Sequence, residues 1–146
     1  MLFRSALGSN RLALGGNSST TFGGALTGSG TLAKSGTGKL TLSGTSGAFA
    51  GLIDVLGGSM LVTGSHAMGS LSLASVASLG GSGFVTTGTV SAAGLIEPGD
   101  SPGILTIDGA LAPVASTSFA FEMTGTGLPI WNMAANSRNE IGRAHV

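Results

Sequence analysis

Short apolar stretches recur along the chain, and each is closed by glycine or serine. In several of them apolar and small polar residues alternate, as in Leu40-Thr41-Leu42 and Leu71-Ser72-Leu73. This period of two is typical of a half-buried β-strand, and no stretch keeps the period of a helix over a useful length. The pattern predicts strands of about three to five residues, spaced by about 8 to 12 residues. They are expected at residues 12–14, 31–33, 40–42, 52–56, 60–62, 71–73, 84–86, 90, 95–96, 104–107 and 118–121.

A repeat with a spacing of 28 residues is also visible. Arg11-Leu-Ala-Leu-Gly-Gly16 aligns with Lys39-Leu-Thr-Leu-Ser-Gly44, and Thr31-Leu32 aligns with Ser59-Met60 at the same spacing. A repeat unit with one apolar edge cannot bury that edge alone, so the copies are expected to stack as coils. Coils of about 25 residues would place successive strands ~4.8 Å apart and divide residues 1–127 into about five coils. Serine and threonine ladders are expected on the outside of this all-β solenoid.

Composition narrows the class of protein. Charged residues make up 8% of the 146 residues, against ~25% in ordinary soluble domains, and the net charge is zero. Glycine, serine and threonine are poor helix formers, which argues against a helical bundle. The 42% hydrophobic content argues against disorder, and the scattered cations argue against a nucleic-acid partner.

Two absences bear on disulfides and on export. The chain has no cysteine, so it has no disulfide framework and no thiol chemistry. No apolar run approaches the ~18 residues of a membrane span. The first residues do not have the pattern of a signal peptide, so we expect any export signal to lie upstream of this chain.

The C-terminal end differs in texture from the rest of the chain. Glu140-Ile-Gly-Arg-Ala-His-Val146 resembles the translation of a sequencing adapter, and the small-residue texture ends near Gly127. We therefore expect residues 1–127 to form a β-helix segment, residues 128–139 to be a tail without assignment, and residues 140–146 to be adapter read-through. The chain is accordingly expected to be a fragment of a longer protein.

Two parts of the chain carry a family resemblance. Residues 30–44, Gly-Thr-Leu-Ala-Lys-Ser-Gly-Thr-Gly-Lys-Leu-Thr-Leu-Ser-Gly, lead on to Gly57-Gly-Ser-Met-Leu-Val-Thr63. Together they resemble the autotransporter-associated β-strand repeat. Leu79-Gly-Gly-Ser-Gly83 and the segment 94–107 resemble a further element of autotransporter passenger domains, and the segment 117–123 is similar to the strand that usually follows.

The resemblance spans Arg11 to Met123 and implies both a fold and a role. The implied fold is a right-handed parallel β-helix, secreted by a Gram-negative bacterium through type V secretion. The implied role is a structural or adhesive passenger segment at the cell surface, non-catalytic, with a host surface or a glycan as its ligand. Its partner in the outer membrane would be the protein's own C-terminal barrel. The sequence departs from the family pattern at Ala48–Ala50, where the usual corner is replaced, and after Gly127.

Two other interpretations of the sequence compete with this one. A β-helical polysaccharide-binding or polysaccharide-degrading protein remains the alternative, and it needs an acid-and-base or aromatic patch on one face. The phenylalanines that would supply an aromatic patch are instead expected to fill the core: Phe22, Phe49, Phe84, Phe119 and Phe121. The ordered repeat argues against a chance translation of low-complexity DNA.

Three short motifs imitate functional signatures but lack an essential part. Gly99-Asp100-Ser101-Pro102-Gly103 matches the hydrolase nucleophile elbow, yet the residue after the serine is a proline without the N–H that an oxyanion hole needs. A double Pro-Gly turn is expected there. Gly36–Thr41 fails as a phosphate loop because leucine follows the lysine. Gly80–Val85 begins like a calcium-binding nonapeptide, but a valine stands at the position of the ligand aspartate.

The remaining acidic residues are expected to have structural roles. Glu97, Asp100 and Asp108 form the densest acidic group, and no lysine or arginine lies between Lys39 and Arg138 to neutralise an acidic substrate beside them. Turn and capping roles are therefore expected for these three carboxylates. Glu122 is expected at an outward position of an alternating strand.

The other polar candidates receive similar assignments. Lys34 and Lys39 are expected as solvated charges on a sheet face or edge, where lysine discourages edge-to-edge pairing. His66, flanked by small residues, is expected in a solvent-exposed turn rather than at a metal. Asn17-Ser-Ser19 is formally a glycosylation acceptor, which carries little weight in a bacterial context. We thus expect no enzyme, and no catalytic, cofactor-binding or metal-ligating residue in this chain.

Overall fold

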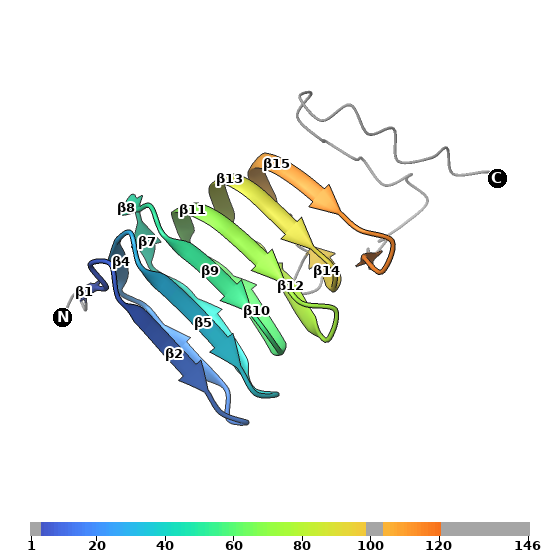
Figure 1. Ribbon diagram of the computed structural model, residues 1–146, viewed down its shortest axis with the longest axis horizontal. Helices are drawn as coiled ribbons and strands as arrows, with labels where there is room; N and C mark the ends of the chain where they lie inside the picture. The colour runs from blue at the N-terminus through green and yellow to red at the C-terminus, as the bar shows by residue number, and fades with distance from the viewer. Residues whose placement is uncertain (1–3, 99–103, 121–146) are drawn as a thin grey trace.

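The computed structural model describes residues 4–98 and 104–120 of the chain. Within these ranges every element is a β-strand, and every pairing between strands is parallel. The strands stack as a β-solenoid of six coils, with the first coil at one end of the long axis and the sixth at the other (Figure 1). The expected all-β, parallel β-helix is therefore confirmed.

The first three coils each have three short faces. Their strands are, in the first coil, β1 (Arg4–Ala6), β2 (Arg11–Gly15) and β3 (Thr20–Phe22). The second coil contains β4 (Ala25–Gly28), β5 (Thr31–Ser35) and β6 (Lys39–Leu42). In the third coil the first face is divided, and the strands are β7 (Thr45–Ser46), β8 (Ala48–Phe49), β9 (Leu52–Val55) and β10 (Gly58–Val62).

The last three coils each have one longer strand and one shorter strand. They are β11 (Ser65–Leu73) with β12 (Ala77–Gly81), β13 (Phe84–Ala92) with β14 (Leu95–Pro98), and β15 (Thr106–Pro113) with β16 (Ser118–Phe119). β11 continues through the corner that separates two faces in the earlier coils, because its start pairs with β7 and its end pairs with β9. The strand length of three to five residues was therefore wrong for the later coils.

Three sheets run along the solenoid. One has the order β1-β4-β8, and a second has the order β3-β6-β10-β12-β14-β16. The third has the order β2-β5-β9-β11-β13-β15, with β7 also paired to β11. In this sheet Arg11 lies beside Thr31, and Thr31 lies beside Leu52, so one coil takes 20 or 21 residues there.

The 28-residue spacing was wrong as the length of a coil. Arg11 begins β2 and Lys39 begins β6, and these strands belong to different sheets. The direct neighbour of Lys39 in the next coil is Ser59, 20 residues later. The two similar segments are thus strands on different faces of the solenoid, and the shorter coils explain why six are present where about five were expected.

The interior is one continuous apolar column. In β9 the residues alternate, so that Ile53 and Val55 are fully buried while Leu52 and Asp54 are partly exposed. Phe49 is buried and Phe22 and Phe119 pack against the column, as expected for core residues. Phe84 was predicted to be in the core, but it is 40% exposed because it starts β13 at an outward position between Ser65 and Thr106.

A column of glycines forms the corner at which each coil passes to the next. Gly44, Gly64 and Gly83 stack there, and the residues after Gly64 and Gly83 are hydrogen-bonded to the carbonyl of the glycine in the coil before. Ser65 N donates to Gly44 O at 3.2 Å, and Phe84 N donates to Gly64 O at 2.9 Å. A Cβ at Gly64 would fall on the carbonyl oxygen of Gly44, so the close approach of these coils requires glycine.

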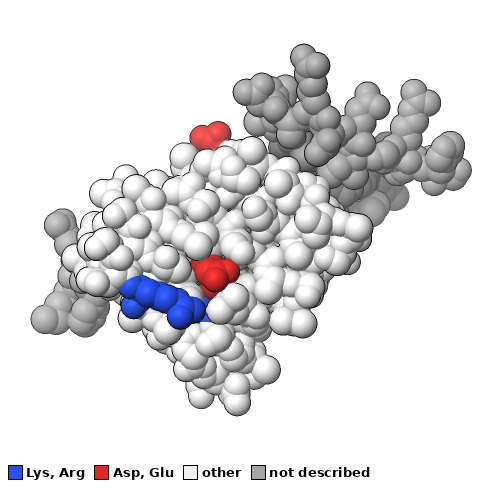
Figure 2. Space-filling view, in the orientation of Figure 1, with Lys and Arg blue, Asp and Glu red and all other residues white. Residues whose placement is uncertain are grey.

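The outer surface carries the expected hydroxyl ladder at one place. Ser78 Oγ donates to Ser59 Oγ at 2.9 Å, from β12 to β10 of the coil before it. Figure 2 shows a surface almost without charge, apart from one basic strip with an acidic group beside it and a second acidic group at the edge of the molecule. Uncharged residues therefore make up most of the described surface that is visible in this view.

Candidate functional site

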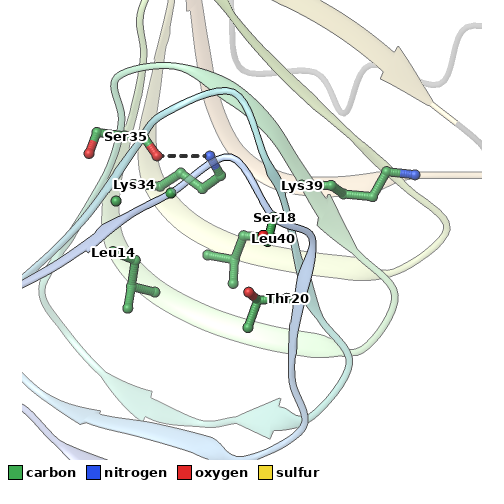
Figure 3. Close-up of a pocket in the computed structure, with 9 residues that line it drawn as sticks. Leu14, Ser18, Thr20, Lys34, Ser35, Lys39 and Leu40 are labelled. Carbon is green, nitrogen blue, oxygen red and sulfur yellow. Dashed lines mark hydrogen bonds between the residues drawn. The ribbon is translucent and has the colours of Figure 1, made fainter.

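A small hollow lies at the corner between the second and third faces of the first two coils. It measures about 120 Å³ and is lined by the end of β2, the turn that leads to β3, and the corner between β5 and β6. The polar side chains at its wall are Ser18, Thr20, Lys34, Ser35 and Lys39. Figure 3 shows these side chains together with Leu14 and Leu40, which also line the hollow.

Lys34 is buried, with 4% of its surface exposed, although it was predicted to be a solvated charge. The reason is its place in β5: strand alternation turns Leu32 and Lys34 to the same, inward side. Its Nζ donates to the carbonyl oxygens of Ser35 and Gly36, both at 3.3 Å, and to that of Gly57 at 3.0 Å. Burial lowers the pKa of the Lys34 ammonium from its usual range.

The three carbonyls account for all three donor protons of the Lys34 ammonium. They belong to the second coil and, in Gly57, to the third, so the side chain joins two coils at their corner. Lys39 is exposed, as predicted, and extends away from the Lys34 ammonium (Figure 3). The hollow thus has one cation that is fully engaged by the backbone and one that is solvated.

We expect Lys34→Met to destabilise the solenoid by about 1–3 kcal/mol, because three partly buried carbonyls then lose their donor. Lys39→Met is the matched control, and it is expected to change stability by less than about 0.5 kcal/mol. Urea unfolding followed by circular dichroism measures both. Equal losses in the two variants would contradict a structural role for the buried ammonium.

A second polar group lies in the core, on the face that β7 and β11 share. His66 is buried, with 1% of its surface exposed, although it was predicted to lie in an exposed turn. It sits in β11 beside Ser46, and its Nδ1 lies 3.1 Å from Ser46 Oγ. The same hydroxyl oxygen accepts a hydrogen bond from Leu26 N at 2.7 Å.

The other ring nitrogen of His66 has no hydrogen-bond partner. Nε2 is buried and unpaired, which is uncommon because a buried polar atom without a partner costs about 1–3 kcal/mol. Burial lowers the pKa of His66 below its usual value, and the backbone of Leu42 opposes this shift. Ser46 and His66 form a hydroxyl–imidazole contact, but it is closed off from solvent and therefore cannot reach a substrate.

The acidic residues within the described ranges do not gather at one site. Glu97 lies in β14 and is half-buried, and Asp108 lies in β15 and is exposed. Both are therefore in strands, and the turn and capping roles predicted for them were wrong. Asp54, which the sequence analysis did not single out, is half-buried at an outward position of β9.

Several predicted positions lie outside the described residues. They are the elbow-like segment around Ser101, with Asp100, and also Phe121, Glu122, and the segments 128–139 and 140–146. Asn17 is described, and its Oδ1 accepts hydrogen bonds from the backbone N–H of Thr37 at 3.4 Å and from Thr37 Oγ1 at 3.0 Å. This contact ties the first coil to the second.

The described ranges lack two further features. Residues 4–98 and 104–120 contain no group of three or more histidine, cysteine or acidic side chains placed to hold a metal ion. The same part of the chain has no helix with the length and apolar character needed to cross a membrane.

The two buried polar groups, Lys34 and the Ser46–His66 pair, hold neighbouring coils together. Lys34 joins two coils at a corner, and the Ser46–His66 contact joins two coils inside the core. The solenoid offers other molecules its outer surface and the hollow at the first two coils, which has Lys39 as its solvated lysine. Comparisons with protein-family models, with curated proteins and with solved structures find no match to this chain.

Proposed function

We propose that this chain is a structural or adhesive passenger segment of a Gram-negative autotransporter, displayed at the cell surface as a non-catalytic scaffold. The observation that carries the proposal is where the family-like motif falls in the fold. Residues 30–44 contain β5 and β6 of the second coil, and residues 57–63 contain β10 of the third coil. The motif therefore coincides with strands that stack on one another, Leu40 beside Met60 and Leu42 beside Val62.

The physical properties of the solenoid support the same proposal. Each coil is built from residues next to one another in sequence, so it can stack on the coils that are already outside as soon as its own stretch of chain has emerged from a pore. The chain has no cysteine, and therefore no disulfide has to be broken before export or formed after it. An elongated stack with few surface charges also serves to hold other groups away from a membrane (Figures 1 and 2).

The test is display in place of a natural passenger. The chain is inserted between a signal peptide and an autotransporter barrel, and surface exposure is measured by protease accessibility on intact bacteria. We expect the chain to reach the surface and to give a protected, folded fragment. Gly64→Ala, which prevents close stacking, should reach the surface less or be digested fully, whereas Gly47→Ala should behave as the parent does.

Binding and catalysis are assayed on the same displayed chain. Adhesion to host cells or retention on a glycan array, without release of sugar products, supports an adhesive scaffold. Retention of the chain in the periplasm, together with full folding of the isolated chain, would contradict the passenger proposal. Release of oligosaccharides from an array polysaccharide would instead favour the polysaccharide-degrading alternative.

A further inference from the structure

The first face of the third coil contains a break in the ladder of backbone hydrogen bonds. β8 pairs with β4 of the coil before it, whereas β7 pairs only with β11 of the coil after it. Beside β7, a side chain makes the hydrogen bond to the second coil: Leu26 N donates to Ser46 Oγ at 2.7 Å. The hydroxyl therefore takes the place that a backbone carbonyl has elsewhere in the sheet.

The same hydroxyl also contacts the fourth coil. His66 Nδ1 lies 3.1 Å from Ser46 Oγ, so Leu26, Ser46 and His66 form a bridge across the second, third and fourth coils. The imidazole is 1% exposed, lies in register between Ser46 and Val85, and leaves Nε2 without a hydrogen bond. The bridge therefore holds a buried imidazole that contacts one hydroxyl through Nδ1, an environment that disfavours a charged ring.

No charged group described in the structure is placed to compensate an imidazolium at this position. The neighbouring strands β4, β7, β8 and β13 contain no charged residue, and neither do β10 and β12 of the opposite sheet. On the other strands, Arg11, Lys39 and Asp108 are exposed, Asp54 and Glu97 are at outward positions, and Lys34 is held by carbonyls at a corner. A charge on His66 would therefore be buried without a partner.

Burial lowers the pKa of folded His66, against the opposing effect of the Leu42 backbone. The direction of the pH effect follows from this. Above about pH 6.5 the imidazole is neutral in both the folded and the unfolded chain, so the group adds no pH dependence. Below that pH the unfolded chain binds a proton that the folded chain resists, and stability falls as the pH falls.

We propose that the Leu26–Ser46–His66 bridge is an acid-sensitive seam, which is closed at neutral pH and opens between the third and fourth coils when His66 is protonated. The seam is independent of the scaffold role proposed above, because it rests on contacts inside the solenoid. It would make a folded passenger, or any other form of this protein, respond to an acidic compartment or surface.

The test is hydrogen–deuterium exchange and urea unfolding of the full chain from pH 8 to pH 5. For the parent chain we expect the unfolding constant to be flat above about pH 6.5 and to rise by up to about tenfold per pH unit below it. After correction for the intrinsic pH dependence, exchange should rise first in peptides that cover residues 25–28, 45–49 and 65–68. Peptides covering β13 should respond less.

Three variants separate the bridge from a general acid effect. His66→Val should remove the pH dependence below pH 6.5. Valine is chosen because the neighbour of His66 in the next coil is Val85. Ser46→Ala should raise exchange at Leu26 at every pH and keep the pH dependence. His145→Gln, which changes the second histidine of the chain, should behave as the parent does.

Two results would overturn the proposal. One is an unchanged pH dependence in a folded His66→Val variant. The other is an NMR titration of the His66 ring in the folded parent chain that gives an ordinary histidine midpoint near pH 6.5. The titration needs no substitution, so it decides the matter even if His66→Val does not fold.

Discussion

Gly64→Ala is expected to destabilise the solenoid by about 3 kcal/mol, the upper part of the range for overpacking in a well-packed interior. The added methyl would fall on the carbonyl oxygen of Gly44, which accepts the hydrogen bond from Ser65 N. Backbone atoms on both sides fix this spacing, so relief requires the third and fourth coils to move apart. Urea unfolding followed by circular dichroism measures the loss.

Gly47→Ala is the matched control for this prediction. A Cβ at Gly47 meets no atom within 4 Å, and this glycine lies in the short link between β7 and β8. Its stability should be unchanged or rise by up to about 1 kcal/mol, because alanine reduces the freedom of the unfolded chain. If Gly64→Ala were as stable as Gly47→Ala, the glycine column would not be what sets the distance between coils.

Leu79→Ala is expected to cost about 2–5 kcal/mol, the usual range for truncating a fully buried leucine. Leu79 is 0% exposed and lies in register between Met60 of the third coil and Ile96 of the fifth. Its removal leaves a cavity that faces both neighbouring coils. Since each coil is stabilised by its contacts with the next, a defect in the fourth coil weakens the stack on both sides.

Leu12→Ala serves as the comparison for the core substitution. Leu12 is 37% exposed and lies in β2 of the first coil, where only β5 pairs with it. We expect a loss well below that of Leu79→Ala, measured by the same unfolding assay and by thermal melting. A similar loss at both positions would mean that burial in the middle of the stack does not determine the cost of truncating a leucine.

The type of fold was readable from the sequence, but the length of its repeat was not. Alternation at Leu40-Thr41-Leu42 correctly indicated a strand, and the small residues between such segments indicated tight corners. The repeat was misjudged because Arg11 and Lys39 begin similar strands on different faces, which a comparison of letters cannot distinguish. Six strands were missed because alanine, threonine, serine and glycine make up most of their residues and resemble loop sequence: β1, β3, β4, β7, β8 and β12.

The two buried polar residues were predicted wrongly, yet the sequence did contain a clue to both. Lys34 follows Leu32 by two residues, and His66 precedes Met68 by two, so strand alternation places each on the same side as a buried apolar residue. What the sequence alone did not supply was their partners. The carbonyl of Gly57 and the hydroxyl of Ser46 come from neighbouring coils 23 and 20 residues away, and they become neighbours only through the register of stacking.

The regular register also determines the entropic cost of closing each coil. Residues that lie side by side on adjacent coils are 17 residues apart in sequence at Ser78 and Leu95, and 23 apart at Leu95 and Ser118. The separations in the other coils fall between these two values. The entropy of closing a loop changes only with the logarithm of its length, so each added coil meets nearly the same entropic cost. Folding can therefore proceed as a zipper, in which the rate-limiting closure is the same for a short stack and a long one.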